Sequence, residues 1–411
     1  MKNVYDMMEE NHAKDNIANF RQMQNWDYEH KVHHAEKVAK IFFEEAREKG
    51  WNAHVSVGGL DSITLHYFLD SIGVLVPCVS CSSLEQRGVQ AVHKRIAADM
   101  AEKYADWIPD QGALPQDEID QIEDAAARAR EQAILDGIQP APYMHFLQPL
   151  KPKVKVIQEF GWPVLSKETA GKISLLQRPT EQNATVRHAI ITGETGEYGG
   201  WQKDSRMRLS GRWLHAFGGA DAEGAALGYE AAPFLVSDRC CYYLKEKPCD
   251  DWAKAHHSVP YLGLMASEHG RREKSLMMHG CNYWGKSTTR SAPFAIFGRQ
   301  DILRLALDLN VPVPGEYGEI VRGPDGTLRT TLAQRTGCTM CGFGIHLEQR
   351  PHRFDRLRDA NPKEWDFWMR HVCQDERGEW YGWGRVLDYI GVGWENEPGQ
   401  VVGQTSMEDL F

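Results

Sequence analysis

Apolar positions recur with helical spacing through most of the first 50 residues, and this pattern ends at Lys49-Gly50. A basic residue followed by glycine is a common helix C-terminus. From His54 a short apolar run ends in two glycines, and a second helical pattern begins at Ile63. We therefore predict a helix, a strand, a glycine turn and a helix in that order.

The same order then repeats. An apolar run at 73–81 predicts a second strand, and the pattern from Val89 to Tyr104 predicts a helix. Strand, helix, strand and helix together indicate a parallel sheet with right-handed crossovers. Weaker patterns predict a charged helix from Gln116 to Leu135 and strands at 141–146, 164–166 and 261–266.

These elements favour an α/β fold with a doubly wound, mostly parallel, Rossmann-like sheet. A helical N-terminal segment and a Trp-rich helical C-terminal region would flank the sheet. We expect three parts, which are a helical segment at 1–50, an α/β domain at 51–330 and a C-terminal region at 331–411 that holds the Cys-x-x-Cys segment and the aromatic residues.

The glycine turn, Gly58-Gly59-Leu60-Asp61-Ser62, has the geometry that binds phosphate. Glycines let backbone N–H groups approach an anion, and the new helix points its positive end at the same place. Candidate nucleotide-binding residues are Ser56, Gly58, Gly59, Asp61 and Ser62. The turn is neither a Walker loop nor a three-glycine dinucleotide motif, and a capped β–α turn without a ligand is the competing interpretation.

Two further segments can contribute to such a site. A glycine-rich loop begins at Gly193-Glu194 and is either a second wall of the nucleotide site or a surface loop. Arg271 and Arg272 follow the predicted strand at 261–266, and arginine side chains suit phosphate or sulfate oxygens. We predict Asp61, Arg271 and Arg272 as catalytic residues.

Composition narrows the class of protein. The formal net charge of −10 over 411 residues argues against a surface that coats nucleic acid broadly, although a local basic groove remains compatible with it. The N-terminus lacks an apolar signal core, and no apolar run approaches the roughly 20 residues that span a bilayer. We expect a cytoplasmic protein with no membrane partner.

Nine cysteines without a secretion signal indicate metal binding or redox chemistry rather than a disulfide framework. Cys338-x-x-Cys341 can present two thiolates to one metal or cluster, and the Cys240-Cys241 pair can complete a four-thiolate site. Cys281 is an alternate ligand. Zinc and buried free thiols are the other interpretations.

The region after Arg350 is rich in aromatic and basic residues. Such a segment can bind single-stranded nucleic acid by stacking and charge. We favour a helical layer packed on the core, with a nucleic-acid or protein partner as the alternative.

Taken in order, these segments resemble the phosphoadenosine phosphosulfate (PAPS) reductase family of the adenine-nucleotide alpha-hydrolase (PP-loop) superfamily. The resemblance runs from about Val55 to Glu348. It rests on the glycine turn, the Cys-Cys pair, the Met265–Arg272 loop, the Phe-x-x-Gln-Asp segment at 297–301 and the Arg-Thr-Gly-Cys segment at 335–338.

The resemblance implies an adenine nucleotide, either ATP or a sulfonucleotide such as PAPS or adenylylsulfate (APS), with its phosphates on the glycine turn. It also implies a 4Fe–4S cluster on Cys240, Cys241, Cys338 and Cys341, as in assimilatory adenylylsulfate reductases. Arg271 and Arg272 would lie near the anion. Mg²⁺ is a further candidate cofactor, and a homodimer a candidate assembly.

The chain departs from the family in two ways. Val57 stands where the first loop serine would be, which removes one hydroxyl contact to phosphate. The reductases attack sulfur with a cysteine near the C-terminus, whereas the last cysteine here is Cys373. Without that thiolate the usual S-sulfo intermediate cannot form.

We therefore expect an iron–sulfur enzyme that acts on ATP or a sulfonucleotide at its α-phosphate or sulfate, in sulfur metabolism or sulfur transfer. One alternative is an ATP pyrophosphatase of nucleic-acid modification or defence that delivers sulfur. The other is a non-catalytic, nucleotide-sensing subunit.

Overall fold

A computed structural model describes residues 16–105, 116–123, 128, 143–195, 206–218, 232–268, 270–286 and 288–395. The chain forms two compact units. Unit 1 comprises Met1–Gln148 and Lys247–Cys338, and unit 2 comprises Pro149–Glu246 and Thr339–Phe411. The expected division at residues 50 and 330 differs from this, because unit 2 is built from two stretches far apart in the chain, which no local pattern reveals.

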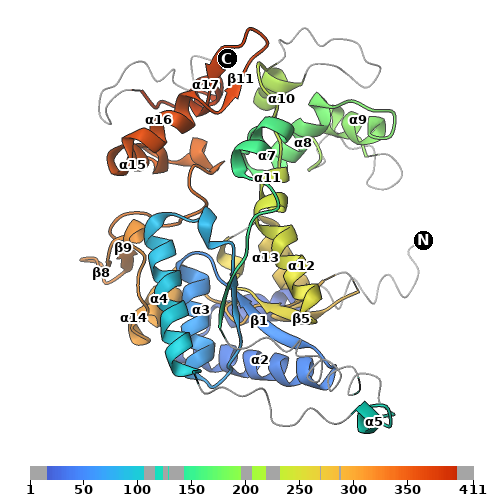
Figure 1. Ribbon diagram of the computed structural model, residues 1–411, viewed down its shortest axis with the longest axis vertical. Helices are drawn as coiled ribbons and strands as arrows, with labels where there is room; N and C mark the ends of the chain where they lie inside the picture. Colours follow the sequence, from blue (N-terminus) through green and yellow to red (C-terminus); the bar gives the residue numbers. More distant parts are fainter. Residues whose placement is uncertain are drawn as a thin grey trace. The chain divides into compact units, whose positions relative to one another are not determined.

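Unit 1 is an α/β structure around a six-stranded sheet of order β3-β2-β1-β5-β7-β6 (Figure 1). The strands of unit 1 are β1 (Asn52–Ser56), β2 (Cys78–Ser80), β3 (Met144–Phe146), β5 (Ser258–Tyr261), β6 (Asn282–Trp284), β7 (Thr289–Ser291), β8 (Ile320–Arg322) and β9 (Leu328–Thr330). In the sheet only the β6–β7 pair is antiparallel, and β8 and β9 form a separate hairpin. The expected mostly parallel α/β sheet is therefore confirmed.

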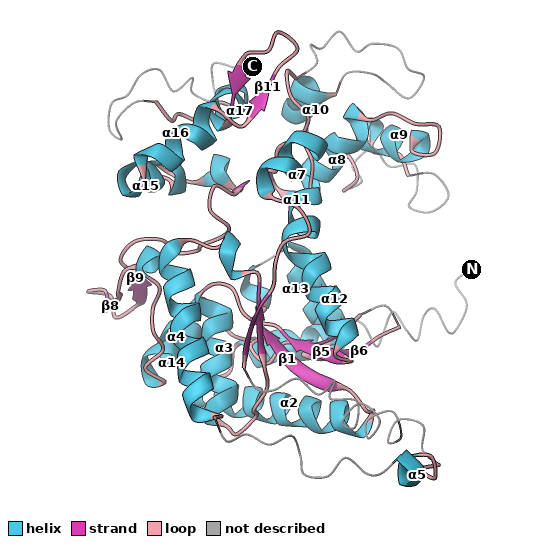
Figure 2. Cartoon of the chain, viewed as in Figure 1, coloured by secondary structure: helices cyan, strands magenta, loops and turns pink. Residues whose placement is uncertain are grey.

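Helices lie around the six-stranded sheet (Figure 2). The helices of unit 1 are α2 (Tyr28–Glu48), α3 (Leu60–Ser71), α4 (Arg87–Lys103), α5 (Gln116–Ile119), α12 (Lys247–Ala255), α13 (Gly270–His279) and α14 (Arg299–Asp308), with short 3₁₀ turns η1 (Ser82–Leu84), η4 (Ala266–Glu268) and η5 (Gly315–Tyr317). Residues 16–24 are also helical. Of the predicted helix at 116–135, α5 and residue 128 are helical, and most of the remainder lies outside the described residues.

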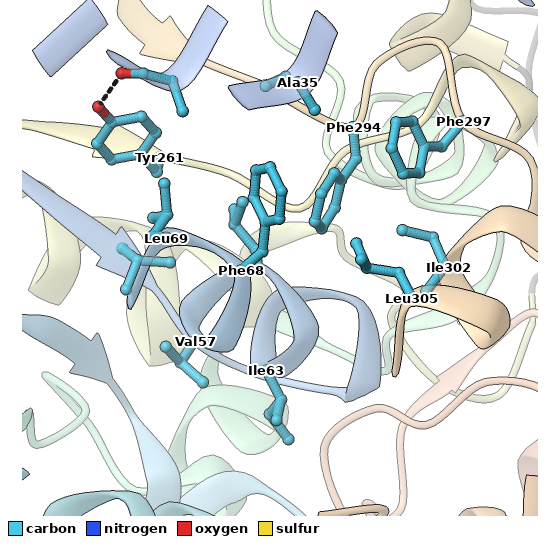
Figure 3. Packing of buried hydrophobic residues seen from close by; sticks show 14 of the residues in the cluster. Ala35, Val57, Ile63, Phe68, Leu69, Tyr261, Phe294, Phe297, Ile302 and Leu305 are labelled. Atoms are coloured by element: carbon cyan, nitrogen blue, oxygen red, sulfur yellow. Dashed lines mark hydrogen bonds between the residues drawn. The ribbon is translucent and has the colours of Figure 1, made fainter. Parts of the chain in front are cut away.

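The core of unit 1 packs helices onto the sheet through aromatic and branched side chains (Figure 3). Phe68 of α3 faces Phe294, with ring centroids 5.4 Å apart. The Tyr261 hydroxyl of β5 donates to the backbone oxygen of Ala39 in α2 at 2.7 Å. Val57 is 5% exposed and belongs to this core. Its apolar side chain is therefore explained by packing.

Unit 2 has a second, separate core. Its helices are α7 (Lys153–Phe160), α8 (Lys167–Gln177), α9 (Ala184–Thr192), α10 (Gly211–Phe217), α11 (Arg239–Cys241), the π-helix η3 (Tyr242–Glu246), the 3₁₀ turn η6 (Ile345–Leu347), α15 (Arg353–Ala360), α16 (Pro362–Arg370) and α17 (Trp383–Ile390). Two short strand pairs, β4 (Val164–Leu165) with β10 (Gly342–Phe343) and β11 (Cys373–Gln374) with β12 (Trp380–Tyr381), complete it.

The predicted strand at 164–166 is present as β4, and it pairs with β10 in unit 2. The predicted strand at 261–266 begins earlier, as β5, and residues 262–265 form a loop. The C-terminal aromatic region is a helical layer as favoured, since Trp365, Trp383 and Trp394 are at most 8% exposed within the second core.

Candidate functional site

The glycine turn follows β1, the strand at which the strand order of the sheet reverses. From β1 the chain adds β2 and β3 on one side, and β5 then pairs with the other side of β1. In open parallel sheets, ligands bind at the carboxyl ends of the strands beside such a switch point. The loops that follow β1 and β5 therefore form the candidate site.

The turn itself is fixed by its own hydrogen bonds. The Gly58 N–H donates to the Ser62 hydroxyl at 2.7 Å, and that hydroxyl donates to the Gly59 carbonyl oxygen at 3.0 Å. Ser62 is therefore a structural member of the turn. Among the hydrogen bonds of the described residues, none uses the N–H of Asp61 or Ser62, so these two groups are open to a ligand at the positive end of α3.

Two glycines let neighbouring segments pack closely against this end of α3. A Cβ at Gly59 would lie 2.7 Å from the Tyr317 hydroxyl oxygen and 3.0 Å from Thr336 Oγ1. A Cβ at Gly263, in the loop after β5, would lie 3.0 Å from the backbone nitrogen of Ser62. Gly263 thus lets the loop after β5 pack directly against the first turn of α3.

The side chains of Tyr317 and His93 each form a hydrogen bond with the backbone of the turn. The Leu60 N–H donates to the Tyr317 hydroxyl at 3.1 Å, and this hydroxyl lies 2.9 Å from Thr336 Oγ1. Fully buried His93 has its Nε2 2.8 Å from the Gly58 carbonyl oxygen, so Nε2 is the donor. Its Nδ1 lies 3.0 Å from the Ser82 hydroxyl, which joins the ends of β1 and β2.

Asp61 forms an ion pair with Arg299 at the start of α14. Nη1 of Arg299 donates to Asp61 Oδ1 at 2.5 Å, and Nη2 donates to the Gln334 backbone oxygen at 3.0 Å. Both ionic side chains are just over one quarter exposed. Burial raises the pKa of Asp61, the positive charge of Arg299 opposes that rise, and the nearby Glu268 carboxylate adds to it.

Further charged side chains lie around this pair. Arg272 donates to both Glu268 oxygens at 2.9 and 2.8 Å, and Arg335 lies 3.8 Å from Glu268. The Arg272 and Arg335 side chains are more than half exposed. A third carboxylate, that of buried Glu85, has its Oε1 3.7 Å from the position of a Cβ on Gly58.

The predicted site residues are only partly brought together. Gly58, Gly59, Asp61 and Ser62 form the turn, Ser56 ends β1 immediately before it, and Arg272 lies in α13 of the same unit. The side chain of Arg271 lies outside the described residues. Sequence reasoning missed Arg299 and Arg335 as members of the site, although both lie in segments that carry the family resemblance.

The loop at Gly193 belongs to unit 2, whereas the glycine turn belongs to unit 1. Gly193 ends α9 in the left-handed conformation, with φ of 85°. The Glu194 carboxylate lies 3.3 Å from His188 Nε2. Residues 196–201 of this loop are outside the described residues.

The predicted cluster ligands are distributed over both units. Cys240, Cys241 and Cys341 belong to unit 2, and Cys338 is the last residue of unit 1. The alternate ligand Cys281 is buried in unit 1, where burial raises its pKa to about 12. Within the described ranges, no group of three or more His, Cys, Asp or Glu side chains is placed to hold a metal ion. The 4Fe–4S assignment stays a prediction from the sequence.

Comparison of the chain with protein families, with curated proteins and with solved structures finds no match. Among the described residues, no helix is both long and apolar enough to cross a membrane. The function is therefore inferred from the geometry of unit 1 and from the resemblance of the sequence to the PAPS reductase family.

Proposed function

We propose that unit 1 binds an adenine nucleotide at the carboxyl ends of β1 and β5, and that the chain is a PAPS reductase-like member of the adenine-nucleotide alpha-hydrolase superfamily. The observation that carries this proposal is the Gly58–Ser62 turn at the switch point of the sheet, where the N–H groups of Asp61 and Ser62 make no hydrogen bond among the described residues. Helix N-termini with free N–H groups are anion sites.

The residues of the proposed nucleotide site have different roles. The N–H groups of Asp61 and Ser62 bind phosphate oxygens, and the glycines admit the phosphate to the backbone. Arg299, Arg272 and Arg335 offset the negative charge of the phosphates and of the transition state. Asp61 holds Arg299 at the mouth of the turn.

The reaction that fits best is attack of a water oxygen on the α-phosphorus of ATP. The new P–O bond gives AMP, the bond from the α-phosphorus to the oxygen that bridges it to the β-phosphorus breaks, pyrophosphate leaves with that oxygen, and the proton of the water passes to solvent. Reduction of a sulfonucleotide would need an accessible thiolate. Burial raises the pKa of Cys78, that of Cys281 in unit 1 to about 12 and that of Cys373, the last cysteine of the sequence, to about 11. These three thiols are poorly placed to attack a sulfonucleotide, so a reductase would have to use one of the partly exposed cysteines, such as Cys249.

Calorimetric titration with ATP and with adenylylsulfate tests the binding. We expect a saturable site for ATP that Gly263→Ala weakens at least tenfold, because the new methyl group crowds the Ser62 N–H. Gly315→Ala is the matched control, since a Cβ there meets no atom within 4 Å. Equal ATP affinity in both variants, or no binding by the unaltered chain, would overturn the proposal.

Product analysis separates the reactions. Pyrophosphate release from ATP supports the proposed chemistry, and sulfite release from adenylylsulfate supports a reductase instead. Binding without either product would assign a nucleotide-sensing role. Iron and zinc contents of protein purified without oxygen test the predicted cluster independently, and a protein free of iron would exclude it.

A further inference from the structure

His93 of α4 contacts the glycine turn from a fully buried position. Its Nε2 lies 2.8 Å from the carbonyl oxygen of Gly58, and its Nδ1 lies 3.0 Å from the hydroxyl oxygen of Ser82 in η1. A carbonyl oxygen only accepts hydrogen bonds, so Nε2 carries the proton. The Ser82 hydroxyl then donates to an unprotonated Nδ1, and the neutral Nε2–H tautomer satisfies both ring nitrogens.

The hydrogen bond from His93 fixes the direction of one peptide unit. The peptide between Gly58 and Gly59 is trans, so its carbonyl oxygen and its N–H point in opposite directions. Because the Gly58 oxygen points to the His93 ring, the Gly59 N–H points away from it. Among the hydrogen bonds of the described residues, none uses the Gly59 N–H. This N–H is a third open donor at the start of α3, in addition to those of Asp61 and Ser62.

This peptide unit is easy to reverse because it lies between two glycines. Reversal changes ψ of the residue before the peptide and φ of the residue after it, and glycine adopts both signs of φ readily. A reversed peptide would present the partly negative Gly58 oxygen to a phosphate in place of the Gly59 N–H. The restraint against reversal therefore has to come from a residue outside the pair.

The other hydrogen bonds of the turn restrain the neighbouring peptide units. The Ser62 hydroxyl accepts from the Gly58 N–H, which belongs to the unit before, and donates to the Gly59 oxygen, which belongs to the unit after. Tyr317 accepts the N–H of that later unit. In the part of the chain that the structure describes, His93 alone forms a hydrogen bond with the unit between the two glycines.

We propose that His93 is a positioning residue of the nucleotide site and directs the Gly59 N–H toward a phosphate of the bound nucleotide. This inference rests on the proposed function. His93 acts through the peptide between Gly58 and Gly59 without touching the nucleotide, and Ser82 selects the tautomer in which Nε2 donates. The start of α3 then presents three backbone donors to the phosphate oxygens.

Calorimetric titration of two His93 variants with ATP tests this inference. The His93→Gln amide extends as far as Nε2 and donates to the Gly58 oxygen, whereas the shorter His93→Asn amide reaches only the Ser82 side. We expect His93→Asn to weaken ATP binding about tenfold, the equivalent of one hydrogen bond to a charged group, and His93→Gln to stay within about threefold of the unaltered chain. His54→Asn, at a buried histidine of β1, is the control and should keep its ATP affinity.

Amide NMR separates the positioning of Gly59 from a general loss of stability. Isotopes at the carbonyl carbon and the amide nitrogen of glycine select the amides that follow a glycine, which in this sequence are Gly59, Gly200 and Gly219. ATP should shift the Gly59 proton downfield in the unaltered chain and in His93→Gln, because a charged acceptor strengthens its hydrogen bond. The proton should not respond in His93→Asn.

The outcomes distinguish this inference from the proposed function. Unchanged ATP affinity in His93→Asn, an equal loss in His93→Gln or in His54→Asn, or the same Gly59 response in both His93 variants would overturn the positioning role and leave ATP binding intact. Absence of ATP binding by the unaltered chain would overturn the proposed function, and the positioning role with it.

Discussion

The carboxylate of Asp61 accepts a 2.5 Å hydrogen bond from Nη1 of Arg299, although 238 positions separate the two residues in the chain. Asp61 belongs to the first turn of α3, and Arg299 is the first residue of α14. The pair therefore ties the glycine turn to the second half of unit 1. It also places a guanidinium group beside the proposed phosphate site.

Replacement of Arg299 by alanine should weaken ATP binding and destabilise unit 1. Removal of one partner of a buried ion pair costs about 3–5 kcal/mol, and the quarter exposure of this pair reduces the expected loss of unfolding free energy to about 1–2 kcal/mol. It should also raise the pKa of Asp61 further, since the opposing positive charge is lost. Chemical denaturation and ATP titration measure these effects.

Arg95→Ala is the control for this variant. Arg95 forms an ion pair with Asp99 one helical turn away in α4, and both side chains are more than half exposed. Its loss should change the unfolding free energy by less than about 0.5 kcal/mol. If Arg299→Ala were equally neutral in stability and ATP affinity, the ion pair would have no role in the site.

The local part of this site was predictable from the sequence, and the long-range part was not. An apolar run followed by two glycines and a helical pattern identified the strand, turn and helix, because these elements depend on neighbouring residues. Arg299 and Tyr317 reach the turn only through the packing of α14 and η5, which leaves no periodic signal. The same limitation applies to unit 2, whose two stretches meet through buried side chains such as Trp162 and Trp383.

Tyr317→Phe should destabilise unit 1 without changing the shape of its core. The Tyr317 hydroxyl accepts the N–H of fully buried Leu60, and a phenyl ring would leave that N–H without its partner. An unsatisfied buried donor costs about 1–3 kcal/mol. Thermal and chemical denaturation should show this loss, together with weaker ATP binding.

Tyr28→Phe provides the comparison, because the Tyr28 hydroxyl bonds the exposed Asp308 carboxylate, which water can satisfy instead. We expect this variant to lose at most about 0.5 kcal/mol of unfolding free energy. A larger effect for Tyr28→Phe than for Tyr317→Phe would mean that the hydroxyl does not support the turn.

Acid should destabilise unit 1 between pH 7 and 5 through buried His54 and partly buried His66. Burial lowers the pKa of His54 to about 3 and that of His66 to about 4, from an ordinary value of 6.5. Between pH 7 and 5 the unfolded chain therefore binds a proton at each of these histidines, whereas the folded chain keeps them neutral. The stability that each neutral histidine contributes is fully present above pH 6.5 and is lost as the pH falls toward the folded value. Linkage gives a loss of about 2 kcal/mol per histidine from pH 7 to 5.

Denaturation curves of His54→Gln and His66→Gln at several pH values test this prediction. Each variant should lose less unfolding free energy than the unaltered chain between pH 7 and 5, by about 2 kcal/mol. Glutamine at position 54 retains a partner for the Ser258 hydroxyl, which lies 2.8 Å from His54 Nδ1. Identical pH dependence in the variants and the unaltered chain would show that these histidines are not the cause.

Asp355→Asn should destabilise unit 2 more than any change to its surface ion pairs. The Asp355 side chain is 2% exposed and accepts hydrogen bonds from Arg350 Nη2 at 2.6 Å, from Arg350 Nε at 3.1 Å and from the His352 N–H at 2.9 Å. An asparagine leaves the guanidinium without a counter-charge, and an amide nitrogen cannot accept from either donor. We expect Asp355→Asn to lower the unfolding free energy by about 3 kcal/mol. Asp366→Asn, at an exposed ion pair with Arg370, should change it by no more than about 0.5 kcal/mol. Four buried tryptophans of the second core contribute to tryptophan fluorescence during denaturation, and equal midpoints for the two variants would contradict the prediction.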